Sequence, residues 1–240
     1  MKSELYIGQL SKIGMAKVIF GLNKRYDIWN CLDTIQNPSA HGHTWKIHPA
    51  LLDKIKDKSE NEVKKIIGAF AGRAYEEESQ AFESTLEDFR ASWQSIEKEF
   101  FKRLKQILQK PICAETFHAY LTTLSERCPW FYEKKAWMVF YRASPSMVQK
   151  ICAHELLHMQ FKRWHQAICL EYLTNEQKEH LREALTFLLN EEFSDLIQAK
   201  DLGYPAHQKL RAELAEEWRK DKNFERFLPK AIEITKRMMK

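Results

Sequence analysis

The residue types that could do chemistry are concentrated at positions 154–158, where the chain reads His-Glu-Leu-Leu-His. On a helix, two residues four positions apart project from the same face one turn apart, so His154 and His158 can bind a single Zn²⁺ ion. Glu155 lies beside them, where a carboxylate can act as a general base. The string therefore predicts a zinc site suited to hydrolysis, with one ion as the cofactor.

A second acidic segment follows at positions 190–195, which read Asn-Glu-Glu-Phe-Ser-Asp. A catalytic zinc site needs three protein ligands and a water, and Glu191 is a carboxylate placed to be the third ligand. Asp195 is four residues further on the same helical face, where it can hold the far nitrogen of a ligating histidine. Glu192 is only about 100° around the helix from Glu191 and is the rival third ligand.

Together the two segments resemble the motifs of the thermolysin-like zinc peptidases, the gluzincins, over about residues 113–207. Carried onto matching positions only, the resemblance implies the ligand and catalytic residues His154, His158, Glu155 and Glu191. It further implies that Asp195 steadies one histidine and that Asn190 supports the other. It implies a zincin-like catalytic unit: a small mixed or antiparallel sheet, the HExxH helix and a second helix that carries the glutamate.

The same resemblance suggests where the oxyanion and the substrate are bound. Thermolysin-like enzymes supply a histidine or tyrosine from downstream of the third ligand, and Tyr204 and His207 are the first such residues here. Extended substrates in that family lie along an edge strand beside the metal helix, which would be 137–141 or its neighbour. Peptide bonds are thus the expected substrates, with Glu155 passing a proton from the attacking water to the leaving amine.

Other interpretations of the same residues can be compared with this one. The extended metzincin pattern requires Gly at 161 and His at 164, and the chain has Phe161 and Trp164, so that family is excluded. His165 is poorly spaced to be a ligand and is expected at the surface. The alternative function is a zincin-derived zinc-binding interaction or regulatory protein without peptidase activity. A third possible function is zinc-dependent hydrolysis of a non-peptide amide.

The elements that must position these residues follow from periodicity and capping. Apolar residues at steps of three and four predict one long helix over 82–108, and β-branched and aromatic runs predict strands at 115–123 and 137–141. Ser144 and Pro145 predict the start of the helix that carries the histidines. Thr174 predicts the start of a second helix that continues to Asp195, before Gly203 ends it.

Composition sets the broad class. With 44% hydrophobic and 30% charged residues, the 240-residue chain reads as a soluble globular protein, and its net charge of +5 predicts no nucleic-acid partner. No apolar run approaches 18 residues and the N-terminus lacks the apolar core of a signal peptide, so we expect no membrane partner. An odd number of cysteines without C-x-x-C spacing favours reduced thiols in the cytoplasm.

The sequence thus predicts an α+β, predominantly helical protein divided near residue 112. A helical N-terminal region, 1–112, would pack on a zincin-like catalytic region, 113–240. We further hypothesise that the N-terminal region covers the cleft. The expected activity is zinc-dependent hydrolysis of peptides or proteins, while substrate sequence and oligomeric state stay open.

Overall fold

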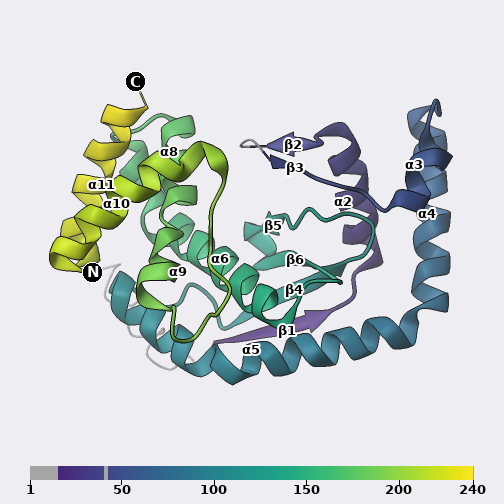
Figure 1. The fold of residues 1–240 in the computed structure, drawn as a ribbon, viewed down its shortest axis with the longest axis horizontal. Coiled ribbons are helices and arrows are strands. Elements are labelled where there is room, and N and C mark those ends of the chain that lie inside the picture. The colour runs from purple at the N-terminus through teal and green to yellow at the C-terminus, as the bar shows by residue number, and fades with distance from the viewer. Residues whose placement is uncertain (1–15, 41–42, 240) are drawn as a thin grey trace, which may run out of the picture.

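The computed structural model describes residues 16–40 and 43–239, and it confirms a predominantly helical α+β protein with a small mixed sheet (Figure 1). The N-terminal residues on which the signal-peptide expectation depends lie outside the described part. The sheet has the strand order β1 (Lys17–Gly21), β4 (Thr116–Thr122), β6 (Ala136–Phe140) and β5 (Trp130–Phe131). The short hairpin of β2 (Ser39–Ala40) and β3 (His43–Thr44) is separate from it.

The first three strands of the sheet are parallel and β5 is an antiparallel edge strand. The predictions of strands at 115–123 and 137–141 are confirmed by β4 and β6. β6 is buried over most of its length, as expected for a strand with neighbours on both sides. β1 was not predicted, and it brings a strand from the first 112 residues into the same sheet. The predicted helical region 1–112 thus also contributes a strand to the sheet of region 113–240.

Three helices from the N-terminal part stand at one end of the sheet, on the right of Figure 1: α2 (Lys24–Gln36), α3 (Pro49–Ile55) and α4 (Glu60–Glu77). They form a second, smaller hydrophobic core with Leu124, which lies just after β4. Asp27 of α2 is buried there, and its carboxylate accepts hydrogen bonds from the Thr123 hydroxyl at 2.6 Å and from the Thr123 backbone N–H at 3.0 Å. This network fixes the turn that leaves β4.

The long helix α5 (Ser79–Leu108) confirms the predicted apolar stripe, and it runs along the lower side of the molecule in Figure 1. The stripe from Phe82 to Leu108 is buried in the main core, and the opposite face is charged. No helix among the described residues is both long and apolar enough to cross a lipid bilayer.

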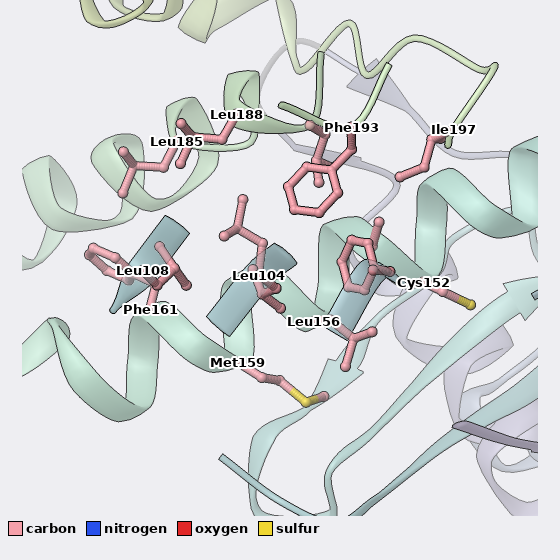
Figure 2. Close-up of a cluster of buried hydrophobic side chains, with 14 of the residues drawn as sticks. Leu104, Leu108, Cys152, Leu156, Met159, Phe161, Leu185, Leu188, Phe193 and Ile197 are labelled. Carbon is pink, nitrogen blue, oxygen red and sulfur yellow. The ribbon is translucent and has the colours of Figure 1, made fainter. Parts of the chain in front are cut away.

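The helix that carries the HExxH string is α6 (Pro145–Trp164), and it begins as predicted. The Ser144 hydroxyl accepts a hydrogen bond from the backbone N–H of Met147 at 3.3 Å, and Pro145 occupies the first turn. Its apolar side, which includes Cys152 and Leu156, belongs to the main core with Leu104 of α5 (Figure 2). α6 is thus held on one side by α5 while its other side carries the histidines.

The remaining helices are α7 (Gln166–Leu170), α8 (Asn175–Ala184), α9 (Phe187–Glu192), α10 (Gln208–Asp221) and α11 (Phe224–Met238). Single turns of 3₁₀ helix are formed by Tyr132–Lys134 and Pro205–His207. The expectation that His165, just after α6, lies at the surface is wrong. It is only 4% exposed because its ring packs beside Phe224 of α11, with ring centroids 4.8 Å apart.

The second site helix begins at Thr174 with the predicted capping box. It does not continue to Asp195, so that prediction is wrong. The chain breaks between α8 and α9, where Leu188 and Leu189 donate backbone hydrogen bonds to carbonyls three residues earlier instead of four. This tighter turn changes the helical phase, so residues before and after the break no longer share a face.

Candidate metal centre

Three side chains from α6 and α8 converge on one point. Nε2 of His154 lies 3.7 Å from Oε2 of Glu183, and Nε2 of His158 lies 3.3 Å from the same oxygen. One candidate ligand atom from each of the three residues lies within 4.8 Å of the others. In a tetrahedral zinc site with bonds of about 2.0–2.1 Å, neighbouring ligand atoms are about 3.3–3.4 Å apart. The two contacts to Glu183 are thus close to the spacing that a three-ligand zinc site requires.

The polar atoms of this cluster also fit a cation. Within the described part of the chain, Oε2 of Glu183, Nε2 of His158 and Oε2 of Glu155 are buried without a hydrogen-bond partner. Buried polar atoms without partners cost free energy, which a coordinated ion and its water would recover. Two imidazole nitrogens and one carboxylate oxygen are a donor set that zinc accepts.

The structure brings Glu183, rather than the predicted Glu191, to the two histidines. Glu191 lies on α9, beyond the helix break, and its Oε2 accepts a hydrogen bond from Nε of Arg219 at 2.9 Å. Its rival Glu192 accepts one from the Trp218 indole at 2.8 Å. Neither belongs to the histidine cluster. The change of helical phase turns both carboxylates toward α10 and leaves Glu183, on α8, facing the histidines.

The aspartate that steadies a histidine is Asp201, not the predicted Asp195. Nδ1 of His154 lies 2.7 Å from Oδ2 of Asp201, so the ring nitrogen that faces away from the cluster is held. Asp195 is instead exposed and forms an ion pair with Arg103 at 2.6 Å. The loop after α9 returns to α6 and brings Asp201 to the position expected for Asp195.

Asn190, predicted to support the second histidine, instead holds the Asp201 loop. Its amide donates to the backbone carbonyl of Asp201 at 2.7 Å and its carbonyl accepts from the Asp201 N–H at 2.9 Å. Arg211 donates a further hydrogen bond to the same carbonyl at 2.6 Å. Gly203 has a φ of 63°, and a Cβ there would lie 2.8 Å from Arg211 Cδ, so the loop requires glycine at this point.

Glu183 is oriented by its neighbour in the sequence. Nη2 of Arg182 donates to Oε1 of Glu183 at 2.7 Å, which leaves Oε2 directed toward the histidines. The Arg182 guanidinium lies over the ring of Trp130 on the edge strand β5, 4.9 Å from its centroid. The same ring is 6.0 Å from that of His158. The edge strand therefore packs directly against the cluster.

The charges of the cluster are set by burial and by these partners. Burial alone would lower the pKa of His154, but the Asp201 carboxylate more than offsets this effect, so the pKa of His154 is raised to about 10. Burial lowers the pKa of His158 to about 3, so this imidazole is neutral and has a lone pair for a metal. Although burial opposes it, His158 and His154 hold the pKa of Glu183 well below its usual range.

Glu155 lies on the inner side of α6 beside a pocket of about 430 Å³. Burial raises the pKa of its carboxyl to about 7, which suits a group that accepts a proton near neutral pH. His154 and Tyr204 line the same pocket. Of the first 112 residues, those described by the structure that reach it are His43 and Trp45.

The two predicted oxyanion donors have different positions. Tyr204 lines the pocket, and burial together with the Glu183 and Glu155 carboxylates raises its pKa, so the phenol keeps its proton. His207 is fully buried and does not line the pocket. It ends a 3₁₀ turn, and its ring packs on His180 of α8 with centroids 4.8 Å apart. The structure therefore leaves Tyr204 as the candidate and excludes His207 from the pocket wall.

Glu183 and Asp201 were both missed by sequence reasoning. The available signal for Glu183 was a charged Arg182-Glu183 pair directly before the segment 184–189, which is apolar except for Thr186. The signal for Asp201 was weaker, since an aspartate two residues before a glycine is common in turns.

Comparisons of this chain with protein-family models, with curated proteins and with solved structures find no match.

Proposed function

We propose that this chain is a zinc-dependent peptidase built on a zincin-like catalytic unit. The observation that carries the proposal is the convergence of His154, His158 and Glu183, with contacts of 3.7 and 3.3 Å between the imidazole nitrogens and the carboxylate. Glu155, between the two histidines, has a buried carboxylate oxygen without a hydrogen bond among the described residues. Three ligands and an adjacent base are the minimum for a catalytic zinc site.

Zinc held by these residues would supply Lewis acidity, which acidifies a water molecule and polarises the scissile carbonyl. Glu155 takes the proton from the attacking water as the carbon–oxygen bond forms. It then delivers this proton to the amine nitrogen as the carbon–nitrogen bond breaks. Tyr204, protonated and in the same pocket, is placed to donate to the developing oxyanion.

The substrate is proposed to be an extended peptide paired with the edge strand. The prediction named 137–141 or its neighbour, and β6 is already paired on both sides, with β4 and β5. β5 is the edge of the sheet, and its Trp130 packs on His158. A peptide that pairs with the open side of β5 would pass beside the cluster.

A reducing compartment fits this proposal. All five cysteines are free thiols, at positions 31, 113, 128, 152 and 169. This supports the proposal that the protein works in the cytoplasm.

The test is metal content and peptide cleavage for the wild type and the Glu155→Gln variant. We expect one zinc per chain in both proteins by elemental analysis. Cleavage of a mixed-peptide library should occur in the wild type alone, stop with a chelator and return with zinc. Undiminished cleavage by Glu155→Gln would refute the role of Glu155. Tight zinc binding without any cleavage would favour a regulatory zinc-binding protein instead.

A further inference from the structure

The pocket beside Glu155 has one wall from the same face of α6. Lys150 precedes His154 by one helical turn, so its side chain leaves the helix on the side of the cluster and lines the pocket. The rim includes Met147, which is 37% exposed, and Leu202, which is 71% exposed. Exposed apolar side chains around a concave site are typical of a surface that is covered when a ligand binds.

Lys150 is half-buried, and its ammonium forms no ion pair or hydrogen bond among the residues that the structure describes. Two carboxylates nearby are already engaged. Asp201 is bound to His154 and Arg211, and Glu155 is the proposed proton acceptor. The Lys150 ammonium acts electrostatically on the Asp201 carboxylate, but no hydrogen bond or ion pair joins the two side chains in the described structure. A half-buried ammonium without such a contact can bind a further anion.

Two other charged residues line the pocket. Lys200 is exposed and adds a second positive charge. Glu126 adds a negative charge, but it is not within ion-pairing distance of Lys150 in the described structure, so it does not neutralise that ammonium. The apolar part of the wall includes Phe140 and Ile151, which can cover the methylene groups of a ligand.

We propose that this pocket binds a substrate carboxylate and that Lys150 is the residue that recognises it. The inference rests on the proposed peptidase function and names its substrate class: peptides with an acidic group close to the scissile bond. The carboxylate can be a glutamate or aspartate side chain or the C-terminus of the peptide. In either case Lys150 donates a charge-assisted hydrogen bond beside the residues that do the chemistry.

The experiment uses peptides that are identical except for Glu, Gln or Lys at each position flanking the scissile bond, with free or amidated C-termini. Cleavage is measured with the wild type, and binding is measured by calorimetry with zinc-loaded Glu155→Gln. Lys150→Met keeps the aliphatic stem and removes the charge. Lys98→Met, at an exposed position on α5, is the matched control. Glu126→Gln removes the opposing charge.

At one position, we expect kcat/KM and affinity to favour Glu over Gln by about tenfold, and Lys150→Met should abolish this preference while zinc content is retained. Lys98→Met should keep the preference and Glu126→Gln should increase it. If Lys150 binds the free C-terminal carboxylate of the peptide, amidation of the C-terminus, and not the change from Glu to Gln, should lower kcat/KM and affinity.

Equal binding of acidic and neutral peptides, or a preference that survives in Lys150→Met, would overturn the inference. A wild type that cleaves nothing, while the Glu155→Gln protein still binds acidic peptides through Lys150, would reject the peptidase proposal and keep the carboxylate site.

Discussion

The contrast between Glu183 and Glu191 can be tested directly with the matched variants Glu183→Gln and Glu191→Gln. Structural zinc sites with four protein ligands bind the ion with about 10–16 kcal/mol, or roughly 2.5–4 kcal/mol for each ligand, and we use the same contribution for each ligand here. A glutamine oxygen is a weaker ligand than a carboxylate, so Glu183→Gln should weaken zinc binding by about a hundredfold.

Glu191→Gln should have almost no effect on zinc. Its carboxylate pairs with Arg219, whose side chain is 55% exposed, and such surface pairs contribute about 0–1 kcal/mol to stability. Zinc affinity should therefore stay within about twofold of the wild type.

Affinities can be measured at pH 7.5 by competition with a chromophoric chelator, and the zinc-dependent rise in Tm should follow the same order. Circular dichroism of the zinc-free proteins checks that both variants fold. Loss of zinc from Glu191→Gln with retention by Glu183→Gln would show that the motif at 190–195 supplies the ligand and that our geometry is mistaken.

Two further predictions concern the surroundings of the site. Asp201→Asn removes the charge that holds His154 at 2.7 Å, and we expect zinc affinity to fall about 10- to 100-fold while Glu191→Gln, measured beside it, stays unchanged. Burial lowers the pKa of His165 to about 4, so the unfolded chain, with its ordinary pKa of about 6.5, takes up the proton first as pH falls. The stability from neutral, buried His165 is thus complete above about pH 6.5 and is lost toward pH 4. With a chelator present, the free energy of unfolding measured with urea should fall by about 2 kcal/mol more for the wild type than for His165→Leu between pH 7.5 and pH 5. A difference between the two proteins that stays constant with pH would contradict the assignment.

Local patterns predicted the elements whose reasons are local. The cap at Ser144 and the proline after it begin α6, and the four-residue spacing of His154 and His158 places both rings on one face. The apolar stripe of α5 and the capping box at Thr174 are of the same kind. Each depends on residues within about two turns, so a single sequence suffices.

The position of Glu183 beside the histidines depends on a helix break, which the hydrophobic periodicity of the sequence does not reveal. Between α8 and α9, Thr186 donates its hydroxyl hydrogen bond to the carbonyl of Glu183 at 2.9 Å, and the chain turns more tightly than an α-helix. α8 then lies between α6 and the C-terminal helices, so it is buried on more than one side and Glu183 does not stand out on a polar face. The same hydroxyl oxygen lies 3.1 Å from Oδ1 of Asp201, so the break is next to the loop that holds His154.

The sequence by itself determined that two imidazoles and a glutamate share one helix, because helical geometry relates neighbours in the chain. Only the tertiary structure decided which distant carboxylates reach them. Glu183 and Asp201 arrive through a helix break and a returning loop, and the packing of α8 against α6, α10 and α11 fixes both. Such packing depends on contacts between segments far apart in the chain, and a short motif contains no information about them.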